Sequence, residues 1–588
     1  MLVYREQRAR DDPLRLLAEL RRDLEGLAPG PRGVHDRVVR VLIALGVLEA
    51  AMADALDDEA DTLHPVTEAL RRASVAAGHL LWHAWHGNDE SLRPWAARAR
   101  AALASVETAA LPARVETRVP EGYAYYGLFP ETYLAAAVRC ARALRMERAV
   151  CVGIRSIGTS LSAVVTAALE ELGIRVRSLT VRPRGDPFDR HLRLAPVLEA
   201  LLRRHANEPF LLVDEGPGLS GSSFAGTACT LSRLGVSDDR IVLMPSWRTD
   251  GSSLRSGSAR DRWRRHAQFS ATFEEVWVET GRLADLVPDM HLRDVSAGSW
   301  RALLLPDPAD YPAAQPQHER RKLLARPKPY SEDRPDLLLR FAGLGSRGEA
   351  RLRRARALAE AGFTPPPTGL AHGFLIQEFR AGAPAAAAEP SPELARTMAR
   401  YLAHLRRCHP AEVATAADLA TMLVTNVREG LGEAAAERLA ARLAPDRAAM
   451  PQEAPTAVDG RMLPHEWVRT SRGYLKADAV DHHDDHFYPG PQDIAWDVAG
   501  TCLEFGLEGD ARRGFLELYR RESGDRSIAG RLPFHALAYL ACRLGYASLA
   551  AESLGDTPDG ARFRTQIVRY RGLLDAELAC GAGARWHA

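Results

Sequence analysis

A short apolar run that leads into two acidic residues and a glycine- and serine-rich loop constrains the fold of this chain most strongly. Residues 210–213 have the continuous apolar character of a buried parallel strand, and residues 224–234 have the pattern of a helix. The loop between them would lie at the carboxyl end of the strand, where open α/β sheets bind ligands. Asp214 and Glu215 begin this loop and would face ribose hydroxyls or a magnesium ion.

The rest of this loop has the composition of a phosphate-binding site. Glycine permits positive φ and close approach by the backbone, and hydroxyl groups beside amides at a helix N-terminus favour an anion. The candidate residues are Gly218, Ser220, Gly221, Ser222 and Ser223. The sequence therefore predicts a site for a sugar phosphate, and the alternative is an ordinary buried turn between a strand and a helix.

A second strand, loop and helix unit lies about sixty residues earlier in the chain. Residues 149–154 read as an apolar strand, and a polar loop over residues 155–161 leads into a helix. Its candidate substrate-binding residues are Arg155, Ser156, Gly158 and Thr159. Two such units predict a doubly wound domain with a parallel sheet.

These two segments resemble motifs of the type I phosphoribosyltransferases. Residues 210–223 are similar to that family's phosphoribosyl-diphosphate motif, with Glu215 in place of the usual second Asp and Ser220-Gly221 in place of Thr-Gly. Residues 155–161 are similar to its pyrophosphate-binding loop. The resemblance implies Mg²⁺-dependent transfer from phosphoribosyl diphosphate to an unidentified small-molecule acceptor. Asp214 and Glu215 would be catalytic, and Asp214 would also bind the metal.

A basic loop follows the strand expected at residues 175–181. Arg182 and Arg184 belong to this loop, which is rich in residues that break regular structure. In the family that the chain resembles, the loop after this strand often closes over the substrate, and its cations would stabilise the leaving diphosphate. The alternative is a solvated surface loop.

Length and charge limit the remaining possibilities. A chain of 588 residues should form several domains, and a formal charge of +1 argues against bulk electrostatic binding of nucleic acid. The sequence contains no eighteen-residue apolar run and no signal peptide, so we expect no membrane partner. The seven cysteines are dispersed, which predicts reduced thiols and a cytoplasmic location. A homo-oligomer is possible on this sequence.

Three regions flank or follow the expected α/β domain. Helical periodicity extends from residue 14 to about residue 112, and prolines interrupt any periodicity between residues 305 and 328. The predicted organisation is a helical region at 1–115, the phosphoribosyltransferase-like domain at 116–300, a linker at 301–330 and a further domain at 331–588. In the helical region, His79, His83 and His86 share one face, which suggests either a metal site or packing against tryptophans.

The last region resembles the kinases of the aminoglycoside-phosphotransferase type. A strand at 337–341, a helix at 349–361 and a strand at 374–379 look like the first lobe and the hinge of a kinase. The resemblance implies that Arg340 replaces the lysine that binds ATP phosphates and that Glu349 is its helix partner. It also places Gln377 and Glu378 beside the adenine, although no glycine-rich loop precedes the Arg340 strand.

The expected catalytic residues of this domain lie farther along the chain. Asp459 would accept the proton of the substrate hydroxyl, Asp478 would bind magnesium, and His465 or Glu466 stands near the expected asparagine ligand. Asp493 and Asp497 match the family's aspartates that anchor the catalytic loop. The Asp/His cluster at 481–486 is either a metal site or a solvated polar loop.

The expected fold class is a multidomain α/β and α+β protein, with a helical region, a doubly wound parallel sheet and a two-lobed kinase-like part. Its expected function is bifunctional: phosphoribosyl transfer together with ATP-dependent phosphorylation of a small metabolite. The alternative is a sensor of a nucleotide or sugar phosphate, in which the kinase-like domain is an inactive scaffold.

Overall fold

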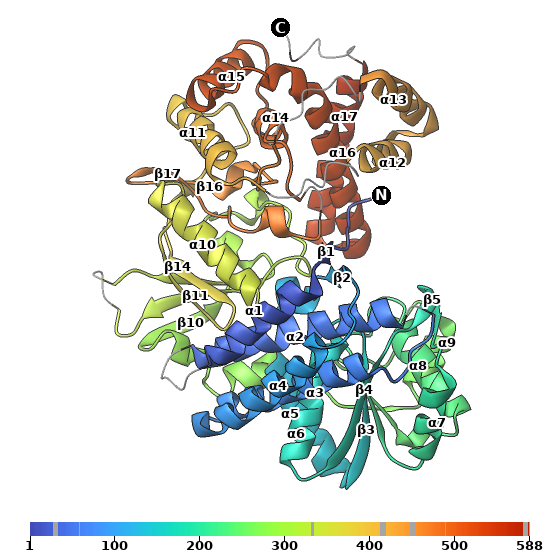
Figure 1. The fold of residues 1–588 in the computed structure, drawn as a ribbon. Helices are drawn as coiled ribbons and strands as arrows, with labels where there is room; N and C mark the ends of the chain where they lie inside the picture. The colour runs from blue at the N-terminus through green and yellow to red at the C-terminus, as the bar shows by residue number, and fades with distance from the viewer. Residues whose placement is uncertain are drawn as a thin grey trace.

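The computed structural model describes residues 1–27, 33–57, 59–330, 334–411, 419–446, 454–487, 490–579 and 586. It is a mixed α/β structure with several sheets, and the carboxyl-terminal helices lie at the end opposite the parallel sheet (Figure 1). Among these residues no helix combines the length and the apolar character needed to cross a bilayer.

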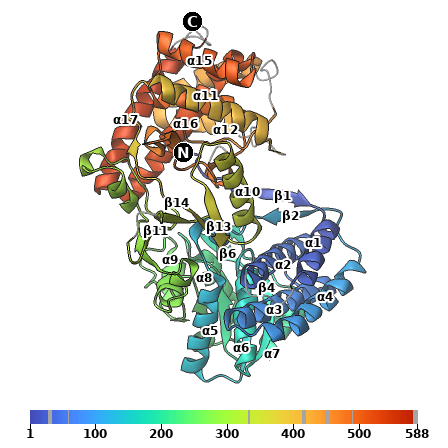
Figure 2. The same cartoon turned by 90° about the vertical axis from the view of Figure 1, so that its left-hand side faces the viewer.

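The amino-terminal region is helical, as predicted. Its helices are α1 (Pro13–Glu25), α2 (Val34–Leu56), α3 (Pro65–Trp85) and α4 (Leu92–Glu107), and the strands β1 (Arg8–Asp11) and β2 (Val115–Arg118) pair across its two ends. Figure 2 shows the four helices side by side. Gly46 of α2 and Gly78 of α3 allow close packing on the next domain, because a Cβ atom at Gly78 would lie 2.5 Å from the carbonyl oxygen of Ala163.

The central region contains the predicted parallel sheet, with strand order β4-β3-β7-β8-β9. The strands are β3 (Arg148–Ile154), β4 (Arg175–Val181), β7 (Phe210–Val213), β8 (Ile241–Met244) and β9 (Ala267–Gln268). The helices are α5 (Pro130–Leu144), α6 (Gly158–Glu171), α7 (Pro196–Arg204), α8 (Ser222–Arg233) and α9 (Gly257–Trp263). Residues that alternate along β3, such as Cys151 and Val152, belong to different apolar clusters, so both faces of the sheet are covered.

Short elements complete this region. A hairpin of β5 (Arg184–Asp186) and β6 (Asp189–His191) follows β4. Single turns of π-helix occur at η2 (Gly122–Tyr126) and η4 (Glu274–Val278). The chain then enters a second sheet.

The second sheet is antiparallel and has the order β10-β11-β12-β14-β13. Its strands are β10 (Met290–Asp294), β11 (Lys322–Pro327), β12 (Leu337–Phe341), β13 (Pro367–Ala371) and β14 (Phe374–Glu378), and α10 (Ser346–Glu360) lies between β12 and β13. The predicted linker at 301–330 is therefore wrong, because β11 lies within it and pairs with β10. The prolines that suggested a linker mostly occupy residues 295–321, an insertion between two paired strands.

The carboxyl-terminal part is mainly helical. Its helices are α11 (Pro392–Cys408), α12 (Leu419–Leu431), α13 (Glu433–Asp446), α14 (Ala495–Glu504), α15 (Gly509–Ser523), α16 (Ile528–Leu554) and α17 (Pro558–Ala579), and its small sheet contains β15 (Ala383–Pro384), β16 (Trp467–Thr470) and β17 (Gly473–Lys476). The second sheet and these helices form two adjoining parts of the structure.

The cores do not follow the boundaries predicted at residues 115 and 300. One apolar cluster continues from α1 through the parallel sheet to the second sheet, and the Phe129 ring lies 5.0 Å from that of Phe273 and 5.6 Å from that of Phe341. The carboxyl-terminal helices have a separate core. Leu2 nevertheless lies against these helices, since its N–H donates to Asn426 Oδ1 over 2.6 Å. The helical region, the α/β region and the second sheet are therefore one packed body.

Candidate functional site

A cavity of about 240 Å³ lies between the second sheet and the carboxyl-terminal helices. Its walls come from the 295–321 insertion, β12, the end of β14, the 460–468 and 477–485 segments, and α16. The cavity is therefore at the junction where the resemblance to a kinase predicts a nucleotide.

Arg340 of β12, predicted to replace the lysine that binds ATP phosphates, lies on the wall of this cavity. It forms an ion pair with Asp478 and lies 3.8 Å from an oxygen of Asp481. Burial opposes the charge of Arg340, but these two carboxylates outweigh burial and raise the pKa of the guanidinium group above its ordinary value. A permanently charged group is thus fixed beside the predicted metal ligand.

Glu349 does not pair with Arg340, so this prediction is wrong. Its carboxylate lies 3.2 Å from the guanidinium group of Arg40 on α2. The face of α10 toward the carboxyl-terminal lobe carries arginines instead, and Arg354 donates to the backbone carbonyl of Ala457 over 2.9 Å. Glu349 is therefore an ion-pair partner of the helical region. The comparison with a kinase did not include this region.

Gln377 and Glu378 line the cavity at the end of β14, where the chain passes from the sheet toward the helices. Gln377 is buried. The backbone N–H of Phe379 donates to the carbonyl of Asp336 over 2.8 Å, which holds this connection against the start of β12. The structure therefore places both predicted adenine-side residues on the cavity wall.

Asp459 does not face the cavity, and its predicted role as the base is contradicted. Its side chain is 0% exposed and accepts a 2.6 Å hydrogen bond from the Tyr401 hydroxyl. The Lys476 ammonium lies 3.2 Å away. Burial raises the pKa of Asp459, but Lys476 and His482 outweigh it and hold the pKa below its usual range. Asp459 is thus an internal ion-pair partner.

Of the two aspartates predicted to anchor this segment, Asp497 does so, whereas Asp493 contacts a different part of the chain. The Asp497 carboxylate accepts hydrogen bonds from the backbone N–H groups of Asp459 (2.6 Å) and Gly460 (2.8 Å). Asp493 lies 2.8 Å from the guanidinium group of Arg531. The residue that follows the anchored pair and reaches the cavity is Arg461, which sequence reasoning missed although it lies within the quoted loop.

His465 lines the cavity but does not join Asp478 in a group of ligands. Its ring lies 5.9 Å from the Trp300 ring, and burial lowers its pKa to about 4. Within the described part of the chain, the potential ligand atoms of Asp478, Asp481 and His482 lie within 4.8 Å of one another. The prediction that His465 is the metal ligand is therefore wrong, and Asp481 and His482 are the better placed side chains.

The rest of the 481–486 cluster is an ion-pair network. Arg320 of the insertion pairs with Asp481 and lies 3.3 Å from Asp485, and Arg347 pairs with Asp484. Neither arginine was linked to the cluster by sequence reasoning, because both lie more than a hundred residues away. Most of the cluster's carboxylates therefore have cationic partners from the protein itself.

The predicted sugar-phosphate loops come together at the edge of the parallel sheet. Gly153 of β3 pairs in register with Val213 of β7, so the loops that follow these strands are neighbours. Gly158 packs closely, because a Cβ atom there would lie 2.5 Å from the Val213 carbonyl oxygen. Gly218 and Gly221 adopt positive φ values of 64° and 70°.

Two hydroxyl groups of this edge, those of Ser220 and Ser222, have partners within the protein. Ser222 Oγ lies 3.0 Å from Ser220 Oγ and donates to the Pro187 carbonyl over 2.6 Å. Ser223 is in the first turn of α8, and Thr159 is buried in the first turn of α6 beside Ser156. Ser220 and Ser222 therefore order the loop before α8, and the N-termini of α6 and α8 face the same edge.

Asp214 and Glu215 occupy the centre of this edge. Asp214 Oδ1 accepts a 2.9 Å hydrogen bond from the Glu215 N–H, and the Glu215 carboxylate packs against Gly122. Burial raises the pKa of Asp214 to about 7 and that of Glu215 to about 8. The two predicted acids are together, in a setting that favours their protonated forms.

The predicted substrate-binding arginines are paired with acids of the helical region. Arg155 and Arg182 both contact Asp54 of α2, with Nε to carboxylate distances of 3.1 and 3.0 Å. Asp61 pairs with Arg155 and accepts from the Arg182 N–H over 2.8 Å, and Arg184 donates to the Asp57 carbonyl over 2.5 Å. The expectation of cations available to a diphosphate is thus wrong for these three, because the helical region neutralises them.

Comparisons with known proteins give partial structural matches. No family model and no curated protein matches the chain. A choline/ethanolamine kinase family protein from Mesorhizobium loti is 18% identical with a TM-score of 0.31, covering 44% of this chain and 88% of that one. Choline kinase LicA from Streptococcus pneumoniae is 12% identical with a TM-score of 0.34, covering 51% and 98%. Macrolide 2′-phosphotransferase MphH from Brachybacterium faecium is 17% identical with a TM-score of 0.33, covering 50% and 98%.

Proposed function

We propose that this protein is a nucleotide-dependent phosphotransferase that acts on a small molecule in the cavity between the second sheet and the carboxyl-terminal helices. The observation that supports this proposal is the composition of the cavity wall. Gln377 and Glu378 lie at the end of β14, and Arg340, Glu466 and Asp478 line the same cavity. A purine, a phosphate chain and a cation would each find suitable groups there.

The roles follow from the chemistry of each group. The apolar side chains of Leu338 and Val468 would contact the adenine of ATP, and the Arg340 guanidinium would bind its phosphates. Carboxylate oxygens are the ligands that magnesium prefers, and Asp478 and Asp481 supply them on the cavity wall, so the donor set fits this ion. Bound magnesium would neutralise charge on the phosphates.

Arg461 gives the site its particular character. A cation lies on the cavity wall next to Gly460, whereas the Asp459 carboxylate is enclosed in the protein. Phosphoryl transfer passes through a loose transition state, so positioning and charge stabilisation supply most of the catalysis. In this proposal Arg340 and Arg461 stabilise the transferred group, and the acceptor lies toward Arg543 and Tyr546 of α16.

Calorimetric titration with ATP, with and without magnesium, tests the proposal. We expect magnesium to tighten ATP binding in the wild-type protein. Asp478→Asn should abolish this effect, so that its affinity for ATP in the presence of magnesium is lower by about tenfold or more. Asp510→Asn is the control, because Asp510 is exposed on α15 and should leave binding unchanged. Equal magnesium dependence in Asp478→Asn and the wild type, or no binding of ATP to either, would overturn the proposal.

A phosphoribosyl-diphosphate site at the edge of the parallel sheet is a second candidate. It is supported by the close approach of Gly158 to Asp214 and by the Ser220–Ser223 segment at the start of α8. Asp214 and Glu215 would orient the ribose, with Asp214 also a magnesium ligand. The test is titration with phosphoribosyl diphosphate and magnesium, with Asp214→Asn as the variant and the exposed Asp250→Asn as the control. Equal binding by both variants would reject the site.

A sensor is the alternative to both activities. It is favoured by Arg461 at the cavity and by the pairing of Arg155 and Arg182 with Asp54. A sensor should be stabilised by a nucleotide or by phosphoribosyl diphosphate without releasing ADP or diphosphate. Release of either product in proportion to enzyme concentration would exclude it.

A further inference from the structure

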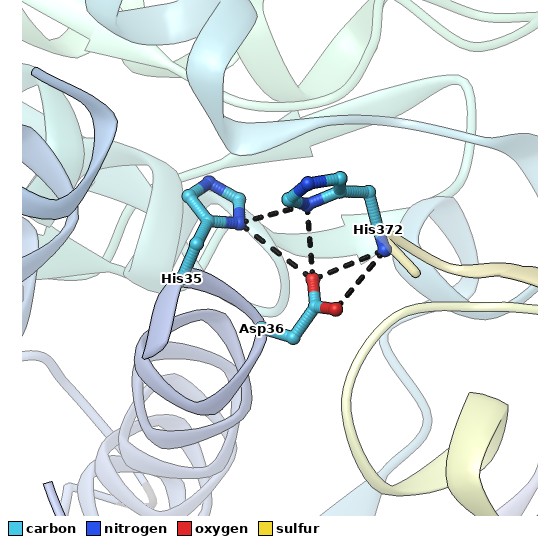
Figure 3. Close-up of side chains that lie close together, drawn as sticks. All are labelled: His35, Asp36 and His372. Carbon is cyan, nitrogen blue, oxygen red and sulfur yellow. Dashed lines mark hydrogen bonds and ion pairs between the residues drawn. The ribbon is translucent and has the colours of Figure 1, made fainter. Parts of the chain in front are cut away.

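Two histidines and an aspartate from distant parts of the sequence converge where the helical region meets the second sheet (Figure 3). His35 and Asp36 lie in the first turn of α2, and His372 lies in the turn between β13 and β14. The proposed phosphotransferase does not use these residues, and they do not line its cavity.

The three side chains direct one atom each toward a common point. The Nδ1 atoms of His35 and His372 are 3.1 Å apart, and Asp36 Oδ1 lies 3.6 Å from the first and 3.0 Å from the second. A triangle of this size can be capped by one ion at about 2.0–2.2 Å from each corner, the usual distance of zinc from nitrogen and carboxylate oxygen. The cluster therefore already has the spacing of a zinc site.

The backbone around His372 fixes this arrangement. His372 has a φ of 48°, a left-handed conformation that residues other than glycine adopt uncommonly. Its own N–H lies 3.1 Å from both oxygens of the Asp36 carboxylate. One contact thus holds the turn and orients the carboxylate at the same time.

A buried carboxylate supports His35 from behind. Glu131, in the first turn of α5, is 1% exposed and lies 2.8 Å from His35 Nε2. Histidines that bind a metal through one ring nitrogen commonly give the other N–H to a carboxylate, which fixes the tautomer and strengthens the ligand. The Glu131 carboxylate is close enough to His35 Nε2 to take this role, and the Nδ1 atom of His35 faces the cluster.

The surroundings leave room for one further ligand. The Trp277 ring lies 4.9 Å from that of His372, and the Trp85 ring lies 5.8 Å from that of His35. The side chains of His35, Asp36 and His372 are 13%, 36% and 25% exposed. Aromatic rings thus cover part of the cluster, and solvent reaches the rest.

We propose that His35, Asp36 and His372 bind one zinc ion, with water as the fourth ligand. Mixed imidazole and carboxylate donors in a tetrahedral arrangement suit zinc. The ion would join α2 to the edge of the second sheet, and β14 of this hairpin ends at Gln377 on the cavity wall. Zinc would therefore stabilise the position of the sheet relative to the helical region.

A proton is the competitor of the metal in this cluster. Without a metal, one proton between the two Nδ1 atoms relieves their mutual repulsion. Burial disfavours a charged His35, but Asp36 and Glu131 outweigh it and raise its pKa to about 9. The experiment must therefore measure the metal itself.

The test begins with protein dialysed against a chelator and then titrated with zinc in the presence of a chromogenic competitor. We expect the wild-type protein to bind one zinc ion tightly per chain. The zinc affinity of Glu131→Gln should be about 10- to 100-fold weaker. His372→Asn should lose the site while retaining its fold, because asparagine tolerates a left-handed turn. His291→Ala is the control, since His291 is exposed on β10 at the opposite edge of the sheet.

Two further measurements test the coordination geometry of the bound metal and the folding of each variant. Cobalt loaded in place of zinc should give the intense visible absorption of tetrahedral coordination in the wild type and in His291→Ala but not in His372→Asn. Circular dichroism of the metal-free variants checks that each is folded. Zinc binding of equal affinity in His372→Asn and the wild type, or a site lost only in Asp478→Asn, would overturn the proposal, as would the absence of zinc binding at micromolar concentration.

Discussion

The Asp497 carboxylate holds the backbone of Asp459 in place, accepting its N–H over 2.6 Å inside the carboxyl-terminal core. The second oxygen of the carboxylate accepts from the following residue, Gly460, so one side chain fixes the path of the chain into the cavity. The conformation of Arg461 at the cavity wall depends on this contact.

Replacement of Asp497 should therefore be costly. Asp497→Ala leaves two buried N–H groups without an acceptor, and we expect the free energy of unfolding to fall by about 2–4 kcal/mol. Asp497→Asn retains one acceptor oxygen, so its free energy of unfolding should fall by less than that of Asp497→Ala. Urea denaturation followed by circular dichroism measures both, and an alanine variant as stable as the wild type would contradict the proposed anchoring.

Arg340 should matter for stability as well as for binding. Arg340→Met leaves the Asp478 and Asp481 carboxylates without their common cation, and removal of one partner of a buried ion pair typically costs about 3–5 kcal/mol. Denaturation in urea should show this loss at neutral pH. Protonating the two carboxylates with acid should reduce the difference in unfolding free energy between Arg340→Met and the wild type. A difference that instead grows in acid would contradict the ion pair as its cause.

The helical region should be inseparable from the parallel sheet. In Gly78→Ala the added Cβ atom meets the Ala163 backbone, and overpacking of this kind costs about 1–3 kcal/mol. Gly514→Ala is the matched control, because nothing lies within 4 Å of its Cβ position and alanine favours a helix by about 0.5–1 kcal/mol. Thermal unfolding should separate the two variants. A Gly78→Ala protein with unchanged stability would show that α3 and α6 are not in close contact.

The acids of the parallel-sheet edge predict a dependence of stability on pH. The folded-state pKa values of Asp214 and Glu215 are about 7 and 8, whereas exposed carboxyls titrate near pH about 4. Between these values the folded protein retains protons that the unfolded chain has released, so stability falls as pH rises. As pH rises through this range, the denaturation midpoint should decline less in the Asp214→Asn, Glu215→Gln double variant than in the wild type. Parallel declines in the two proteins would contradict the raised pKa values.

The 295–321 insertion should open when its contact with α17 is weakened. Arg301 makes a two-pronged contact with Asp559, with nitrogen to oxygen distances of 2.6 and 3.1 Å. Asp559→Asn should increase cleavage of residues 302–313 by a protease of broad specificity, whereas Asp556→Asn, at a fully exposed position, should not. Mass spectrometry of the fragments locates the cuts, and identical cleavage patterns would argue against the contact.

The sequence was informative where the signal is local. A continuous apolar run, as in residues 210–213, indicates a buried strand whatever its neighbours are, and the glycines after it reveal a turn with positive φ. The Asp497 anchor was found because it lies in a short element with recognisable spacing. Local burial and local backbone conformation were sufficient for these predictions.

Partners distant in sequence could not be predicted in this way. Glu349 was assigned to Arg340 by analogy, but the charge of Arg40 on α2 is what lies beside it. Asp54 neutralises Arg155 and Arg182 from a helix about a hundred residues earlier, and nothing in the pattern of either segment records this. The pairing of charged side chains depends on how the regions pack, and a periodicity describes only one region at a time.

The contact between Leu2 and Asn426 has a consequence for how the molecule is made. The N–H of Leu2 donates to Asn426, and the amide of Asn426 returns a hydrogen bond of 3.1 Å to the Leu2 carbonyl, across 424 positions of sequence. These two segments meet only when the long stretch of chain between them has folded, and closure of so long a loop slows folding. A bulky group attached at Met1 would therefore disturb α12, whose Asn426 makes both of these hydrogen bonds.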